Sequence, residues 1–125
     1  MQTGSIENLK VWQKSMDLAQ NIYAFTQILP PEEKFGLCDQ MRRAAVSIPS
    51  NIAEGHGRIS NKEFLRFLTI AKGSLNELRT QALLCNRLFS VDQGIYDSII
   101  SSALEVERML ISLMHSLYNA DNVSK

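Results

Sequence analysis

The stretch that decides the fold is residues 60–89, SNKEFLRFLTIAKGSLNELRTQALLCNRLF. Its apolar residues recur at alternating intervals of four and three: Phe64, Leu68, Ala71, Leu75, Leu78, Ala82, Cys85 and Phe89. This spacing lays one apolar face along an α-helix for four heptads. Ser60 and Glu63 have the spacing of a capping box, and Ile59 and Phe64 that of a hydrophobic staple, so we expect the helix to begin at residue 61.

The same periodicity predicts helices over residues 9–29, 32–56 and 93–119, beside the helix over 61–89. Pro30 and Pro31 end the first of these, and Pro49 lies inside the second and should bend it. Residues 120–125 should fray, and no segment alternates apolar and polar residues as a strand does. The short connections favour an all-α, antiparallel, up-down-up-down four-helix bundle with a proline-bent second helix, in a single domain over residues 1–125.

The predicted helices over residues 9–29, 61–89 and 93–119 each carry apolar residues on more than one stripe. In the first helix, one stripe comprises Leu9, Trp12, Met16, Ala19, Tyr23 and Thr26, and its neighbour comprises Leu18, Ile22, Phe25 and Leu29. In the last helix, Ile100, Leu104, Ile111, Met114 and Tyr118 lie beside the stripe from Ile95 to Leu117. One stripe closes the bundle, and the other favours a homo-oligomer; the alternative is that it only widens the core.

Composition excludes several classes of protein. The longest apolar run, residues 82–85, is far too short to span a bilayer, and residues 1–5 do not form a secretory signal, so we expect a cytoplasmic protein without membrane contact. Cys38 and Cys85 lie in apolar patterns and are expected to be buried thiols. The net charge is zero, yet residues 38–80 hold seven cations against four carboxylates.

A polar row crosses the second and third helices. Its members, which we call the polar seam, are Arg43, Ser47, Asn51, Glu54, Gly73, Ser74 and Glu77. If these helices are antiparallel, Ser47 lies near Gly73, and Arg43 forms a partly buried ion pair with Glu77. The row could line a ligand or active site, but we favour a network that fixes the register of the helices.

Signatures of catalysis are missing from the sequence. Glu54 and His56 are spaced two apart, whereas di-iron bundles need Glu-x-x-His, and His115 has no carboxylate three residues before it. No nucleophile elbow, phosphate-binding glycine loop or Cys-x-x-Cys motif is found. We therefore expect no catalytic residue, no metal ligand and no cofactor.

The cations suggest a nucleic-acid interface. The candidates for binding phosphate are Lys10, Lys14, Arg42, Arg58, Lys62 and Arg66. Such residues give salt-dependent binding that does not depend on base sequence. The alternative is an ordinary solvated helix face.

Four segments resemble one family: LKVWQK at residues 9–14, FGL at 35–37, RRAAVSIPSNIAEG at 42–55, and the stretch from Phe67 through Gly73 and Ser74 to Leu78. Together they resemble the four-helix-bundle proteins of the 23S ribosomal RNA intervening-sequence family over about residues 9–90. The resemblance implies a ring, usually a pentamer, and kinship with the accessory protein of diversity-generating retroelements, whose basic ring binds a reverse transcriptase and nucleic acid. The polar-seam positions are those that define this family.

Two functions follow from the sequence. The first is a non-enzymatic oligomeric scaffold that binds RNA through basic residues of the second and third helices. The alternative is an adaptor that docks a partner protein on an apolar helix surface and has no role with nucleic acid.

Overall fold

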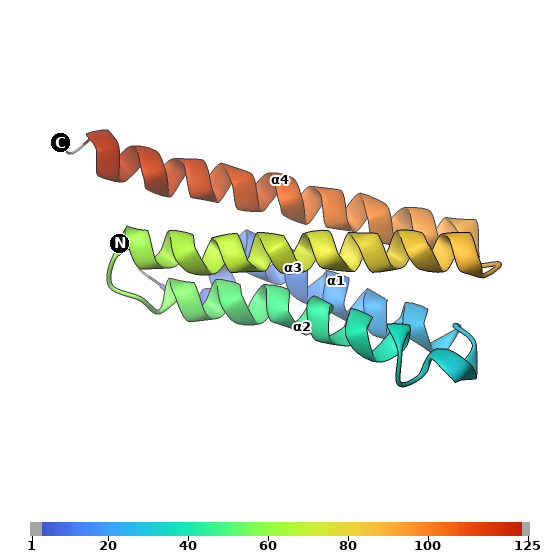
Figure 1. Cartoon of the computed structure of the whole chain (residues 1–125). Coiled ribbons are helices and arrows are strands. Elements are labelled where there is room, and N and C mark those ends of the chain that lie inside the picture. The colour runs from blue at the N-terminus through green and yellow to red at the C-terminus, as the bar shows by residue number, and fades with distance from the viewer. Residues whose placement is uncertain (1–3, 124–125) are drawn as a thin grey trace.

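The chain folds as a four-helix bundle, seen in a computed structural model that describes residues 4–123 (Figure 1). The four α-helices are α1 (Lys10–Gln27), α2 (Leu37–His56), α3 (Asn61–Leu88) and α4 (Gln93–Val123), and two 3-10 turns are η1 (Ile6–Asn8) and η2 (Pro31–Glu33). Each helix packs against the next, and α4 packs back on α1. In Figure 1 the α2–α3 connection lies at the end that carries both chain termini, and the other two helix connections lie at the opposite end. The predicted all-α bundle is confirmed, and residues 4–123 contain no strand.

The start of α3 follows the sequence signal in part. The Ser60 hydroxyl accepts a hydrogen bond from the backbone N–H of Glu63 at 3.1 Å, as a helix N-cap does. The carboxylate of Glu63 pairs with Arg66 at 3.3 Å. The predicted staple is wrong, because Ile59 is 88% exposed while Phe64 is buried in the core.

Helix α2 begins five residues later than predicted. Residues 31–33 form the separate turn η2, and Gly36, with ψ of −108°, leaves the helical region of backbone space. The Glu33 carboxylate accepts from the N–H of Leu37 at 3.4 Å and so caps the true start of α2. Pro49 lies inside α2, which continues through it as a helix.

Helix α4 extends beyond its predicted end at residue 119. Residues 120–123 are helical, so the prediction of fraying is wrong there, and residues 124–125 lie outside the described residues. The amide of Asn61 donates to Asp121 at 3.2 Å, which ties the last turns of α4 to the start of α3. The amide of Asn122 donates to the carbonyl of Tyr118 at 3.0 Å. The other helix bounds fall within two residues of prediction.

The face of α1 that enters the core is the second of its two apolar stripes. Leu18, Ile22 and Phe25 are fully buried, whereas Met16 and Tyr23 of the first stripe are 40% and 42% exposed. Ser15 is also buried, and its hydroxyl donates to the carbonyl of Trp12 at 2.8 Å. A serine that is satisfied within its own helix can occupy the core, so α1 turns its Leu18 side inward.

None of the helices in residues 4–123 is both long enough and apolar enough to cross a membrane.

Candidate functional site

Three residues of the polar seam form a compact hydrogen-bonded cluster between α2 and α3. The hydroxyls of Ser47 and Ser74 lie 2.8 Å apart. The Asn51 amide donates to the Ser47 carbonyl at 2.8 Å and to its hydroxyl at 2.9 Å. All three side chains are half-buried and hydrogen-bonded to one another, so the cluster links the two helices at one register.

The charged members of the seam lie outside this cluster. Arg43 pairs with Asp39 on its own helix at 3.0 Å, and its side chain is 78% exposed. Glu77 is exposed, and the predicted partly buried Arg43–Glu77 pair is therefore wrong. Glu54 is exposed and pairs with Arg58 at 3.1 Å. Pairs one helical turn apart form with little loss of side-chain freedom, which favours these local partners.

Gly73 of the polar seam is not a point of close approach between helices. A Cβ placed on Gly73 would meet nothing within 4 Å, so no helix approaches it closely. The glycine that a close approach requires is Gly55, where a Cβ would lie 2.7 Å from Cβ of Phe67 and 3.3 Å from the carbonyl of Phe64. Gly55 lies within α2 and allows the start of α3 to pack against it.

Three of the six candidate phosphate-binding cations are paired with acids. Lys14 lies 3.8 Å from Glu105, Arg58 pairs with Glu54, and Arg66 pairs with Glu63. The guanidinium groups of Arg58 and Arg66 also lie over the ring of Phe67, at 4.9 and 4.5 Å from its centroid. Each of these two guanidinium groups therefore contacts both a carboxylate and an aromatic ring of its own chain.

The other three candidates differ from one another. Arg42 donates to the Thr26 hydroxyl at 2.8 Å and lies 4.6 Å from the centroid of the Tyr23 ring, so it bridges α2 and α1. Lys10 and Lys62 are exposed and make no ion pair within residues 4–123. Arg58 and Arg66 share the Phe67 ring beside the α2–α3 connection, and Lys62 lies one turn before Arg66, whereas Lys10 and Lys14 lie on α1 and Arg42 lies near the start of α2.

Both cysteines are buried thiols, as predicted. Burial raises the pKa of Cys38, and it raises that of Cys85 to about 11, with a smaller contribution from the nearby Cys38. Cys85 also contacts the sulfur of Met41 at 3.7 Å. A thiol that resists ionisation is a poor nucleophile. In the described part of the chain, no group of three or more His, Cys, Asp or Glu side chains is placed to hold a metal ion.

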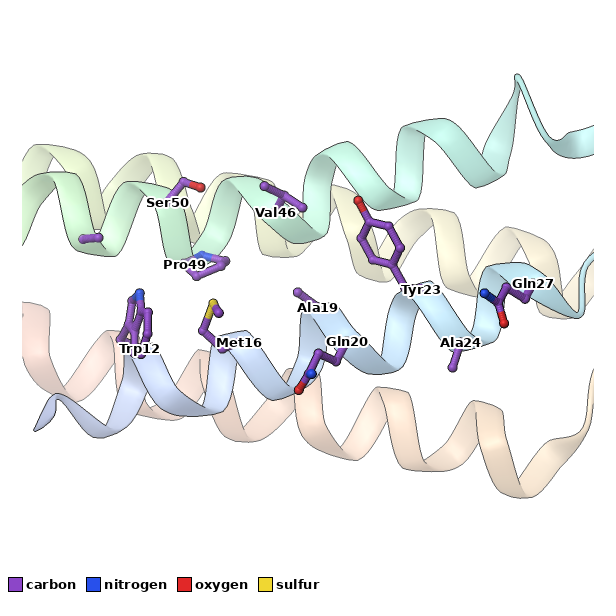
Figure 2. A pocket seen from close by; sticks show the side chains of 11 residues that line it. Trp12, Met16, Ala19, Gln20, Tyr23, Ala24, Gln27, Val46, Pro49 and Ser50 are labelled. Atoms are coloured by element: carbon purple, nitrogen blue, oxygen red, sulfur yellow. The ribbon is translucent and has the colours of Figure 1, made fainter. Parts of the chain in front are cut away.

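The most developed concave surface is a groove between α1 and α2 that the sequence did not single out (Figure 2). It has a volume of about 690 Å³. Its lining residues are Trp12, Met16, Ala19, Gln20, Tyr23, Ala24, Gln27, Val46, Pro49, Ser50 and Ala53. None of these side chains is charged, although charged residues make up 21% of the chain. We call this surface the α1–α2 groove.

The two walls of the α1–α2 groove are formed by side chains of α1 and of α2. In Figure 2, Trp12, Met16 and Tyr23 reach from α1 toward Val46 and Pro49 of α2. The α1 wall includes Trp12, Met16, Ala19 and Tyr23 of the first stripe, so the periodicity had indicated these residues but not which of the two stripes would face the core. The α2 wall consists of Val46, Pro49 and Ala53, which recur at intervals of three and four and could have been recognised by that spacing.

Comparisons with known proteins find one matching family model and a similar solved structure. Residues 7–112 match the model of a family described as 23S rRNA-intervening sequence protein. A crystal structure from Bacteroides thetaiotaomicron, described as a protein of unknown function from the S23 ribosomal protein family, is similar to this chain with a TM-score of 0.77 and 30% sequence identity. The similarity covers 84% of this chain and 95% of that one. A comparison with curated proteins finds no match.

Proposed function

We propose that this chain, which belongs to the 23S rRNA-intervening sequence protein family, is a non-enzymatic scaffold that assembles with copies of itself through the α1–α2 groove. The observation that carries the proposal is the uncharged groove, because it leaves the rings and thioether of Trp12, Met16 and Tyr23 partly in water. Contiguous apolar surface of this kind is typical of contacts between proteins.

The energetics favour a contact at this surface. Full burial of an exposed apolar side chain of this size gives about 1.5–3 kcal/mol, and a contact here would gain the smaller part that belongs to the surface still exposed, about two-fifths of Met16 and of Tyr23. No lining side chain of the groove is charged, and the nearest cation, Arg42, lies over the Tyr23 ring and donates to Thr26, so it keeps these partners when the groove is covered. Gln20, Gln27 and Ser50 supply hydrogen-bonding groups beside the apolar residues.

We take the number of copies to be five, which is what the resemblance to ring-forming bundles and to retroelement accessory proteins implies. We place the assembly in the cytoplasm, where two buried free thiols stay reduced. A ring of this kind would repeat the same groove and the same basic residues around its axis.

The groove is tested by Met16→Glu, which places a carboxylate between the two walls. Met16 is already 40% exposed, so the isolated bundle should tolerate the change. In sedimentation velocity, the wild type should sediment as an oligomer and Met16→Glu as a single chain with unchanged helical circular dichroism. Ile70→Glu on α3 is the matched control, since Ile70 is 42% exposed and lies outside the groove. An oligomer that persists in Met16→Glu contradicts the proposal.

A second function, RNA binding, is favoured by the grouping of Arg58, Lys62 and Arg66 near the α2–α3 turn. Lys62 is exposed and without an acidic partner in the described residues. The two arginines would have to exchange Glu54 and Glu63 for phosphate, which lowers the net gain from binding. Repetition of the three cations around an oligomer would strengthen the field that a nucleic acid meets.

RNA binding is tested by changing Arg58, Lys62 and Arg66 to glutamate and measuring the electrophoretic mobility of a structured RNA. The wild type should retard the RNA, with an affinity that falls steeply as salt rises, and the variant should not. Equal retardation by both proteins, or none by the wild type, rejects this function and leaves the scaffold intact.

A further inference from the structure

Both cysteines of the chain lie beside one methionine in the core of the bundle. Cys38 and Met41 lie about one turn apart on α2, and Cys85 lies on α3, 47 positions after Cys38 in the sequence. The sulfur atoms of Cys85 and Met41 are 3.7 Å apart. Burial raises the pKa of the Cys85 thiol, and Cys38 is close enough to raise it further. The fold thus gathers three sulfur-bearing side chains, which we call the sulfur cluster.

The sulfur cluster is shielded from water and has only weak partners. Cys85 and Met41 are fully buried, and Cys38 is 6% exposed. The Cys85 thiol donates to the thioether of Met41, which is a weak acceptor. The Cys38 thiol donates to the carbonyl of Thr26 at 3.4 Å, and a thiol is a weak donor. A cation that prefers sulfur would therefore displace little when it binds here.

The spacing within the cluster suits a shared metal ion. Bonds from a metal ion to thiolate are about 2.3 Å long, so two sulfurs that bind one ion lie at most about 4.6 Å apart. The sulfurs of Cys85 and Met41 meet this condition as the fold stands. Cys38 precedes Met41 by three positions, a spacing that puts two side chains on the same side of a helix. The third sulfur is thus held next to the other two.

The ligand types select the kind of ion. Thiolate and thioether ligands together suit the soft ion Cu(I). A structural zinc site needs four ligands, drawn from cysteine, histidine and carboxylate side chains. In the part of the chain that the structure describes, no group of three or more such side chains is placed to hold an ion. Two thiols and one thioether are therefore a better match to three-coordinate Cu(I) than to zinc.

The charge beside Cys38 favours such an ion. Cu(I) bound by two thiolates carries one net negative charge, which a buried site has to offset. Burial raises the pKa of Cys38, the positive charge of Arg42 opposes this effect, and Glu33 adds to it more weakly. The charge of Arg42 therefore acts on this thiol. Arg42 makes no ion pair with a carboxylate within residues 4–123, so it can offset the charge of the bound site.

A small pocket offers the ion a way in. It has a volume of about 270 Å³ and lies between the end of α1 and the start of α2. Lys34, Cys38 and Arg42 are among its lining residues. Cys38 thus separates the pocket from the two deeper sulfurs, so an ion would meet Cys38 first and then Met41 and Cys85.

We propose that Cys38, Met41 and Cys85 bind one Cu(I) ion in the core of the bundle. Three copper–sulfur bonds form, the two thiols release their protons to the solvent, and no electron is transferred. Cys38 gives up its hydrogen bond to Thr26 as it turns toward the ion. None of the three residues lines the α1–α2 groove, so the proposal stands independently of the scaffold function.

The site is tested by anaerobic titration of the full chain with Cu(I) in competition with a chromophoric Cu(I) chelator. The wild type should bind one ion per chain, and excess Zn²⁺ should not displace it. X-ray absorption at the copper edge should show three sulfur ligands at about 2.3 Å. Cys38→Ser and Cys85→Ser should each lose this complex, and Met41→Leu should leave two sulfur ligands on the copper.

Met109→Leu is the matched control for the methionine. It removes a thioether from α4, where Met109 lines a different pocket, and should keep the binding of the wild type. Circular dichroism shows whether each variant keeps its helices, and the absorption spectrum of the wild type decides the ligand set even if a variant unfolds. The proposal is overturned by a wild type that binds no copper or shows fewer than three sulfur ligands. It is also overturned by a folded Cys85→Ser that binds Cu(I) as the wild type does.

Discussion

At the scale of single residues, the two glycines of the α2–α3 region lie in opposite environments, one in a close contact between helices and the other facing open space. Gly55 is buried where Phe64 and Phe67 leave no room for a methyl group. Gly73 is exposed, with open space around its Cα. The sequence could not separate the two, because both lie in helix interiors near small residues and only packing distinguishes a required glycine from an unsupported one.

This contrast predicts opposite effects of the same substitution. Gly73→Ala should raise the free energy of unfolding by about 1 kcal/mol, because alanine favours the helix and meets no neighbour. Gly55→Ala should lower it by about 1–3 kcal/mol, because the added methyl must displace Phe67. Urea denaturation measures both. A stabilised Gly55→Ala would contradict the close contact between Gly55 and Phe67.

The buried thiols predict a dependence of stability on pH. Burial raises the pKa of Cys85 to about 11 from its usual value of 9.0, so the folded chain holds a proton that the unfolded chain releases. The unfolded state therefore binds fewer protons between pH 9 and 11, and stability should be intact below pH 9 and fall across that window. Denaturation curves of the wild type should show a steeper loss there than those of Cys85→Ala. Equal slopes would indicate that Cys85 ionises freely in the fold.

At the scale of helices, a few hydrogen-bonded polar side chains mark how α2 packs on α3 and which side of α1 faces the core. The register of α2 on α3 is marked by the Ser47–Ser74 hydrogen bond, and Ser15 lets the Leu18 side of α1 face the core. The periodicity of α1 offered two adjacent stripes of equal regularity. Choosing between them requires the positions of α2 and α4, which a single helix does not contain, and this is why the groove was missed.

The register bond predicts coupling between α2 and α3. Ser47→Ala and Ser74→Ala should each destabilise the fold, and the double variant should be less damaging than the sum, with a coupling of about 0.5–1.5 kcal/mol. Arg43→Ala and Glu77→Ala provide the contrast, because these side chains do not pair and their effects should add. Additive effects for the two serines would show that the hydrogen bond does not fix the register.

At the scale of the whole molecule, the fold could be predicted much more fully than the site. Four periodic segments, the double proline and the Ser60 cap were enough to indicate the bundle, because each is a local pattern. The late start of α2 depends on Gly36 and Glu33, and the groove depends on how two helices leave a face uncovered. The spacing of apolar residues reports neither, because the first is a local matter of backbone angles and a side-chain cap and the second arises from tertiary packing. The predicted cations were real surface residues, but the acids that pair with Arg58 and Arg66 became evident only in three dimensions.

The central claim is that apolar contact between copies, rather than charge, builds the scaffold. The most direct measurement is the absolute mass of the wild-type chain by light scattering after nuclease treatment, at low salt and at high salt. Contact through the uncharged groove predicts a fixed multiple of 14.1 kDa, five-fold for the proposed ring, that does not fall as salt rises. A mass of 14.1 kDa under both conditions, or an assembly that dissociates in high salt, would contradict it.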